Sequence, residues 1–181
     1  MDESTGLILK ALRYSAEKHS DQRRKNAEAS PYINHPIQVT EILWTIGDVR
    51  DTTLLLASIL HDTIEDTDAT PQEIKEEFGE EVLDLVLEVT DDKNLPKKAR
   101  KQNQIETAPL KSRNAKMLKL ADKISNIGEI IDSPPRDWSL KRRQEYLLWT
   151  EKVVAGLRGI NAKLEERYDK LLAYGNQSLG L

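Results

Sequence analysis

The sequence contains no cysteine, a single phenylalanine and only three histidines. The lack of cysteine excludes disulfides, thiolate metal ligands and a cysteine nucleophile, and it fits a reducing compartment. Because aromatic residues make up only 5% of the chain, the core must be mostly aliphatic. No apolar run is long enough to cross a bilayer, and the acidic start of the chain lacks the pattern of a signal peptide. We therefore expect a cytoplasmic protein that does not act at a membrane.

The charge balance is slightly acidic. Lys and Arg number 27 and Asp and Glu 31, for a formal net charge of -4. This balance argues against a protein that binds nucleic acid through its overall charge. With 181 residues, 38% of them hydrophobic, the chain is long enough for one domain with a substantial core. No repeat or linker divides it, so we expect a single domain over residues 1–181.

Apolar residues recur at helical spacing almost throughout, whereas strand alternation is nearly absent. The clearest helix start is Thr70, followed by Pro71 and by Glu73, which complete a capping box with proline in the first turn. The segment Arg50 to Ile64 is apolar almost all round and predicts a buried central helix. The charged segment Asp91 to Arg113 predicts a connection with one exposed helix. The expected fold is therefore an all-α, single-domain helical bundle, with helices near 4–19, 35–47, 50–64, 70–79, 82–89, 114–132, 139–157 and 161–172.

The strongest chemical signal lies at the end of the predicted central helix, where His61 and Asp62 are followed by Glu65 and Asp66. On a continuous helix, His61 shares a face with Glu65, and Asp62 shares one with Asp66. Acidic groups at a helix C-terminus oppose its dipole, and a bound cation would reverse that cost. The alternative is a solvated acidic helix end. The histidine and the leucine-rich helix before it favour a metal site.

Two further ligands are less certain from spacing alone. His35 begins a helix, where the dipole favours the neutral imidazole that binds metals, but it could equally cap the helix or pack under Tyr32. Asp122 lies off the main apolar stripe of its helix, on a second stripe with Ala115, Leu118 and Asn126. If only the main stripe is buried, Asp122 is a surface acid. Periodicity therefore leaves both assignments open. The remaining histidine, His19, is expected to be structural.

Basic residues form three groups, each of which alone is typical of a solvated surface: Arg23-Arg24-Lys25, Lys97-Lys98 with Arg100-Lys101, and Lys141-Arg142-Arg143. If these groups converge near an acidic metal site, they would bind a polyphosphate, since arginine offers paired donors and lysine a mobile charge.

At this point the residues resemble a known family. His35, His61-Asp62 and Asp122 are similar to the scattered signature of HD-superfamily phosphohydrolases. Three longer segments resemble the hydrolase domain of RelA/SpoT-type enzymes and the small alarmone hydrolases: Tyr32-Ile33-Asn34-His35-Pro36, Leu60-His61-Asp62-Thr63-Ile64-Glu65-Asp66-Thr67 and Lys119-Leu120-Ala121-Asp122-Lys123. The resemblance covers nearly the whole chain and implies an HD-type helical bundle.

The resemblance also implies an activity and a set of site residues. It implies a Mn²⁺-dependent hydrolase that removes pyrophosphate from the ribose 3′ position of ppGpp and pppGpp. Four residues match the metal ligands: His35, His61, Asp62 and Asp122. Two match the groups that handle the attacking water: Glu65 and Asp66. Six match positions around the nucleotide: Arg24, Lys25, Lys97, Asn126, Arg142 and Tyr146. A mixed set of imidazoles and carboxylates also suits Fe²⁺ or Zn²⁺.

One departure from the family pattern affects substrate choice. Many relatives carry an arginine and then a threonine or aspartate soon after the matched asparagine, whereas this chain has Ile127, Gly128 and Glu129 after Asn126. Two alternatives therefore stay open: a phosphatase acting on another nucleotide such as NADPH, and a nucleotide-sensing domain without turnover. The oligomeric state, a dimer included, is also open.

Overall fold

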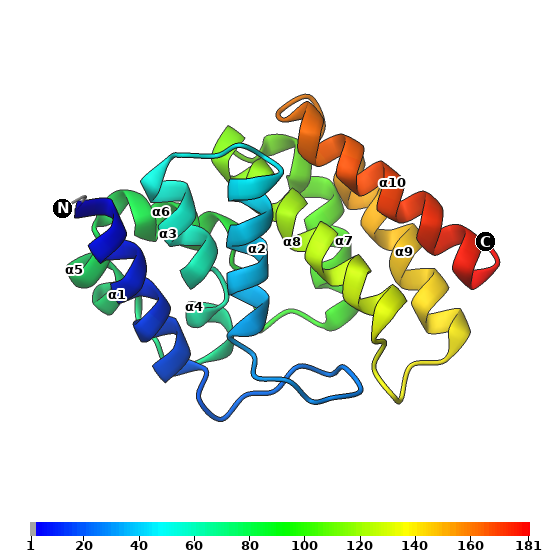
Figure 1. Ribbon diagram of the computed structural model, residues 1–181, viewed down its shortest axis with the longest axis horizontal. Helices are drawn as coiled ribbons and strands as arrows, with labels where there is room; N and C mark the ends of the chain where they lie inside the picture. The colour runs from blue at the N-terminus through cyan, green and yellow to red at the C-terminus, as the bar shows by residue number, and fades with distance from the viewer. Residues whose placement is uncertain (1–2) are drawn as a thin grey trace.

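Helices and their connecting loops, the longest of them between α1 and α2, make up residues 3–181, which are the residues that the computed structural model describes (Figure 1). Their bounds are α1 (Glu3–Lys18), α2 (Asn34–Thr45), α3 (Thr52–Leu60), α4 (Thr63–Asp66), α5 (Pro71–Phe78), α6 (Glu80–Val89), α7 (Lys97–Thr107), the 3₁₀ helix η1 (Ala108–Leu110), α8 (Arg113–Asp132), α9 (Leu140–Ala155) and α10 (Ala162–Leu179). Within this range the structure has no strand, only an isolated bridge between Arg23 and Pro31. The expected all-α fold is confirmed.

Helix α2 lies in the middle of the bundle, between α3 on one side and α8 on the other (Figure 1). Helices α1 and α6 pack on α3, and α9 and α10 pack on α8. Of these central helices, α2 carries His35, α8 carries Asp122, and α3 ends directly before His61. The site therefore rests on the most enclosed part of the bundle.

Helix α3 is the buried centre that its composition predicts. Asp51 begins it by accepting a hydrogen bond from the backbone N–H of Leu54, and every residue from Leu54 to Leu60 is buried. Burying one leucine side chain contributes roughly 1.5–3 kcal/mol, so this segment supplies a large part of the core free energy. It also gives the site a rigid base.

The expected continuous helix over Arg50 to Ile64 is wrong. Helix α3 ends at Leu60, and the short α4 begins only at Thr63. The side chains compete for the carbonyl groups that a continuing helix would use: the His61 imidazole bonds to the Ser58 carbonyl, and the Thr63 hydroxyl to the Leu60 carbonyl. The interruption is local, because the Tyr32 hydroxyl contacts both Asp62 and Asp66, so these two carboxylates lie on one side as the sequence predicted.

Other sequence predictions can be compared directly with the helices. The capping box at Thr70 is present, with Glu73 bonded back to the Thr70 backbone and Pro71 at the first position of α5. Helix α7 is the expected exposed helix, with no buried residue. The last helix runs to Leu179 rather than ending near Leu172, because its buried stripe continues through Gly175. No helix within the described range is long and apolar enough to span a membrane.

Candidate metal centre

His35, His61 and Asp62 form a tight cluster, with one ligand atom from each lying within 4.8 Å of the others. His35 is the second residue of α2, His61 follows the last residue of α3, and Asp62 precedes α4. Both imidazoles are buried, at 3% and 6% exposure. Two separate parts of the sequence, the start of α2 and the junction between α3 and α4, thus bring their polar groups to one point.

His61 has its proton arrangement set by the backbone. Its Nδ1 lies 2.8 Å from the carbonyl oxygen of Ser58, which can only accept, so Nδ1 carries a hydrogen. Its Nε2 has no hydrogen-bond partner among the described residues and lies 3.2 Å from Asp62 Oδ2. Burial alone would lower the pKa of His61, but the negative charge of Asp62 outweighs it and raises this pKa to about 9. The position between Nε2 and Asp62 therefore attracts a cation, either a proton or a metal.

His35 presents its Nε2 to the same point. This atom lies 3.2 Å from Asp122 Oδ1 and 3.7 Å from Asp62 Oδ2. On the other side of the ring, Nδ1 lies 3.0 Å from the Ser125 hydroxyl. Burial lowers the pKa of His35 against the opposing effect of Asp122, which favours the neutral imidazole that binds metals.

Asp122 is buried, at 8% exposure, because both stripes of α8 are covered. Its Oδ2 accepts a hydrogen bond of 2.9 Å from the Lys123 ammonium, and its Oδ1 accepts one of 2.6 Å from the Asn126 amide. Burial would raise the pKa of Asp122, but Lys123 and His35 hold it well below its usual range. The surface-acid alternative is thus excluded for Asp122.

The donor set fits a divalent metal. His35, His61 and Asp62 converge, Asp122 Oδ1 lies 3.2 Å from His35 Nε2, and among the described residues no hydrogen bond satisfies Nε2 of His61. Without a cation, nitrogen lone pairs would face carboxylate oxygens across about 3 Å in a buried site, which is costly. Mixed nitrogen and oxygen ligands suit Mn²⁺, Fe²⁺ or Zn²⁺.

Glu65 and Asp66 lie beside this cluster on α4. Glu65 accepts a hydrogen bond of 3.0 Å from the backbone N–H of Asp91, and Arg100 lies 3.9 Å away. Burial and the nearby Asp62 charge raise the pKa of Glu65. Asp66 faces the Tyr32 hydroxyl at 3.3 Å and pairs with Lys93. Both carboxylates are thus positioned by the segment after α6, which the sequence suggested only as a connection.

The cluster opens into a cavity of about 190 Å³ that contains the four candidate ligands and both carboxylates. It shares Arg24, Tyr32, Asp66 and Asn126 with a neighbouring cleft of about 420 Å³. The cleft is also lined by Lys25 and Tyr146. Four of the six expected nucleotide contacts therefore surround one space next to the cluster.

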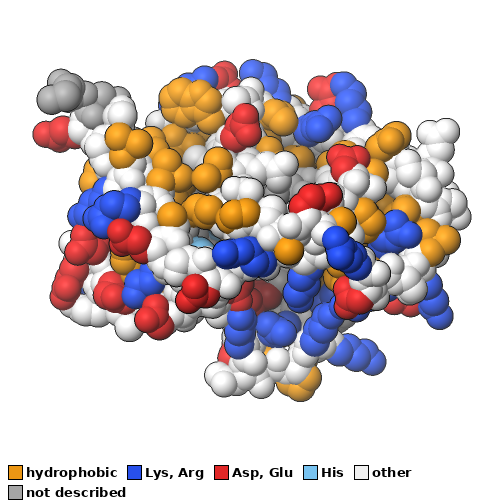
Figure 2. Space-filling view, turned by 60° about the horizontal axis from the view of Figure 1, so that its bottom comes forward, with side chains coloured by type: hydrophobic (Ala, Val, Ile, Leu, Met, Phe, Trp, Pro, Cys, Tyr) orange, Lys and Arg blue, Asp and Glu red, His pale blue; other side chains and the backbone are white. Residues whose placement is uncertain are grey.

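Lys97 and Arg142 do not line this cleft. Lys97 lies near Arg142 and near Lys25, and Lys25 does line the cleft. Burial lowers the pKa of Lys97, and so do the positive charges of Arg142, Lys25 and Arg100. The three basic groups of the sequence therefore converge in the fold. Figure 2 shows Lys and Arg side chains gathered around a hollow at the lower centre of this face.

Arg24 is held by Glu129, one of the residues at which the sequence departs from the family pattern, and by the matched Asn126. Its guanidinium donates to both carboxylate oxygens of Glu129 and, over 3.0 Å, to Asn126. Gly128 leaves open space, because a Cβ there would meet only Leu171, at 3.8 Å. Glu129, one of the departing residues, thus orients Arg24, and it is not among the residues that line the metal cavity.

Sequence reasoning missed the polar groups that hold the ligands. Tyr32 donates its hydroxyl hydrogen to Asp62 over 2.7 Å, and Lys123 pairs with Asp122 although both are buried. Each lies inside a motif quoted for the resemblance, which was the available signal. His19 is outside the cluster: it stacks on Tyr32 with ring centroids 4.7 Å apart and bonds to Gln22.

The bundle and its cluster define an all-α protein with a buried centre for a divalent metal. The chain belongs to the HD domain family, whose model matches residues 11–151. It is 49% identical to guanosine-3′,5′-bis(diphosphate) 3′-pyrophosphohydrolase MESH1 of Xenopus tropicalis over 171 residues, which cover 94% of this chain and 96% of the relative. The human MESH1 is 48% identical over 166 residues, 92% of this chain and 93% of the relative.

A solved structure gives the same result for the fold. It is of a metazoan SpoT orthologue described as hydrolysing ppGpp and acting in starvation responses. It superposes with a TM-score of 0.91 at 43% identity and covers 93% of this chain and 94% of its own. The HD-type helical bundle expected from the resemblance is confirmed.

Proposed function

We propose that this protein is a Mn²⁺-dependent hydrolase that removes pyrophosphate from the ribose 3′ position of ppGpp or pppGpp, leaving GDP or GTP. One observation carries the proposal: an acidic cavity with the metal cluster opens directly into a cleft with basic residues around it. The acidic part suits a metal and water, and the basic part suits a polyphosphate. The activity named for the MESH1 relatives supports the same reaction.

In this proposal His35, His61, Asp62 and Asp122 hold the metal. A bound divalent metal supplies a Lewis acid that lowers the pKa of water and neutralises phosphate charge. The protein contributes ligands in fixed orientation, since Ser125, Ser58, Lys123 and Tyr32 each bond to one of them. Loss of such a supporting contact typically lowers metal affinity or activity by about 10- to 100-fold.

Glu65 and Asp66 manage the protons. Water adds to the phosphorus next to the ribose 3′ oxygen, the bond between that phosphorus and the 3′ oxygen breaks, and the sugar oxygen gains a proton. Glu65 is the better base because its raised pKa lies closer to neutral pH, where a base is most effective. Asp66, which faces both the cavity and the cleft, orients the water.

The basic residues bind the nucleotide. Arg24 and Lys25 line the cleft beside Tyr146 and Asn126. Lys97 and Arg142 extend the positive region and would neutralise the negative charge of the pyrophosphoryl group that is transferred to water. The proposal places the enzyme in the cytoplasm, with a small nucleotide as its partner.

The test is incubation of the purified protein with Mn²⁺ and ppGpp, followed by analysis of products. We expect GDP and pyrophosphate in equal amounts, and product formation slower by about 10²- to 10⁴-fold with Glu65→Gln. NADPH and pppGpp complete the panel, because the unusual Glu129 lines the nucleotide cleft. Comparison of kcat/KM ranks the substrates. No turnover of ppGpp by a folded, metal-loaded protein would contradict the proposal.

A further inference from the structure

The two cluster histidines are oriented by different means. For His61 the partner of Nδ1 is a backbone carbonyl, which can only accept. For His35 the partner is the Ser125 hydroxyl, which can either donate or accept. A hydroxyl alone therefore leaves open which nitrogen of His35 carries the hydrogen.

A third residue resolves this ambiguity. The Ser125 hydroxyl donates its single hydrogen to Oε1 of Gln38 over 2.7 Å. With the Gln38 amide in this orientation the hydroxyl hydrogen is used, so Ser125 accepts from His35 and the ring hydrogen lies on Nδ1. The Nε2 lone pair is then directed at Asp62 and Asp122.

We propose that Gln38 and Ser125 are positioning residues that hold His35 in its metal-binding tautomer through the relay Gln38–Ser125–His35. The inference rests on the proposed metal centre and does not depend on the identity of the nucleotide. Ser125 and His35 are buried, whereas Gln38 is exposed on α2.

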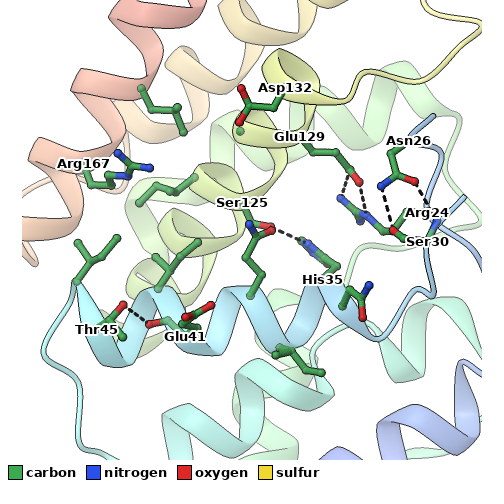
Figure 3. A pocket seen from close by; sticks show the side chains of 18 residues that line it. Arg24, Asn26, Ser30, His35, Glu41, Thr45, Ser125, Glu129, Asp132 and Arg167 are labelled. Carbon is green, nitrogen blue, oxygen red and sulfur yellow. Dashed lines mark hydrogen bonds and ion pairs between the residues drawn. The ribbon is translucent and has the colours of Figure 1, made fainter. Parts of the chain in front are cut away.

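The relay links the metal centre to the outside of the bundle. Gln38 and Ser125 line a groove of about 700 Å³ between α2, α8 and α10, on the side of His35 away from the cluster. Figure 3 shows Ser125 and His35 pointing toward one another across this groove, with the hydrogen bond between them. A change at one exposed side chain should therefore reach a buried ligand.

Substitution of Gln38 tests the direction of the relay, because glutamine, glutamate and lysine have similar helix propensities. Glutamate can only accept, so Gln38→Glu keeps the present direction. Lysine can only donate, so Gln38→Lys makes Ser125 accept from position 38 and give its hydrogen to Nδ1 of His35. The hydrogen of the ring then moves to Nε2, the atom that faces the metal.

Two measurements separate the outcomes. The first is the Mn²⁺ dissociation constant from calorimetry, where we expect an increase of about 10- to 100-fold for Gln38→Lys and for Ser125→Ala, and little change for Gln38→Glu. The second is ¹H–¹⁵N NMR of the histidine rings in the metal-free protein, where His35 should change from the Nδ1–H to the Nε2–H form in Gln38→Lys alone. His61 is an internal control, since its backbone partner is unchanged.

Two other residues that line the same groove, Glu41 and Arg167, provide control variants for the change in net charge. Glu41→Gln changes the net charge by the same amount as Gln38→Lys, and Arg167→Gln by the same amount as Gln38→Glu, without touching Ser125. Both controls should leave metal affinity unchanged. The relay is overturned if Gln38→Lys keeps the His35 tautomer and the affinity, or if Gln38→Glu weakens binding as much as Gln38→Lys does. The NMR result stands even if ppGpp proves not to be the substrate.

Discussion

Lys123 donates a hydrogen bond of 2.9 Å to its neighbour Asp122, and both side chains are buried in the same wall of the site. Burial would lower the pKa of Lys123, but the Asp122 charge outweighs it and raises this pKa above its ordinary value. The ammonium also lies 4.8 Å from the centre of the Trp149 ring. Lys123 thus supplies the positive charge that allows a ligand carboxylate to be ionised inside the protein.

Replacing Lys123 by methionine should destabilise the metal-free protein by about 3–5 kcal/mol, because the substitution leaves Asp122 as a buried charge without its partner. With Mn²⁺ the loss should be smaller, since the metal supplies the missing positive charge. Urea unfolding with chelator and with Mn²⁺ measures both. The control Lys170→Met removes only an exposed pair with Glu166 and should change little. Equal losses with and without metal would contradict this role.

The raised pKa of His61 predicts that pH acts oppositely on the metal-free and metal-bound forms. A histidine whose folded pKa is about 9 and whose ordinary value is 6.5 stabilises the fold fully below pH 6.5. That contribution is lost as pH rises through about 9. Metal binding instead requires the proton to leave, so Mn²⁺ affinity should rise over the same range.

Melting temperatures between pH 6 and 9.5 check this prediction. With chelator the Tm should fall as pH rises, while the added stabilisation from Mn²⁺ should grow. The variant His61→Gln should remove both trends. A metal-free Tm that stays flat from pH 6.5 to 9 would show that His61 is not held protonated by Asp62.

Local signals in the sequence predicted local features of the fold well. The capping box at Thr70 and the burial of Leu54 to Leu60 depend on residues close in the chain, and both are present. The all-α class follows from the same helical periodicity. The break between α3 and α4 was missed because two side chains, His61 and Thr63, replace backbone donors, and periodicity does not register such a competition.

Features that depend on packing could not be predicted from spacing alone. Asp122 is buried only because α2, α9 and α10 cover both stripes of α8. The convergence of Lys25, Lys97 and Arg142 depends on three segments meeting in space. The roles of these residues were predicted only from the family resemblance. The ion pair between Arg24 and Glu129 could not be predicted in that way, because this chain departs from the family pattern at Glu129.

Replacing Glu65 by glutamine should reduce kcat by about 10²- to 10⁴-fold, the usual range for loss of a general base. The change keeps the shape of the side chain and the hydrogen bond from the Asp91 backbone, so folding and Mn²⁺ affinity should change little. Steady-state kinetics and calorimetry measure the two effects. Glu81→Gln, on the exposed start of α6, is the matched control. An active Glu65→Gln enzyme would assign the base elsewhere.

The pH profile of the normal enzyme gives an independent check on Glu65. A base must be deprotonated to act, so kcat should fall as pH decreases through its pKa. Because burial and Asp62 raise that pKa, the acid limb should lie above 4.5, the ordinary value for glutamate. A profile that stays flat down to pH 4.5 in a folded, metal-loaded enzyme would exclude this assignment.

Arg24 and Glu129 should act as one unit in nucleotide binding. Glu129 engages Nε and one terminal nitrogen of Arg24, which leaves the other terminal nitrogen for a ligand in the cleft. Arg24→Lys removes this forked geometry and should raise KM about tenfold or more, since hydrogen bonds to charged groups contribute roughly 1.5–3 kcal/mol. Glu129→Gln should raise KM less, because the arginine remains but is held less firmly.

A double-mutant cycle decides whether the two residues are coupled. If Glu129 acts only by orienting Arg24, the combined variant should bind no worse than Arg24→Lys alone, and kcat should stay nearly constant because Glu65 and the metal ligands are untouched. The control Arg13→Lys changes an exposed arginine of α1 that pairs with Glu17 and does not line the cleft, so KM should not move. Additive effects of Arg24→Lys and Glu129→Gln would instead mean that Glu129 contacts the nucleotide independently, which would make it a direct determinant of substrate choice.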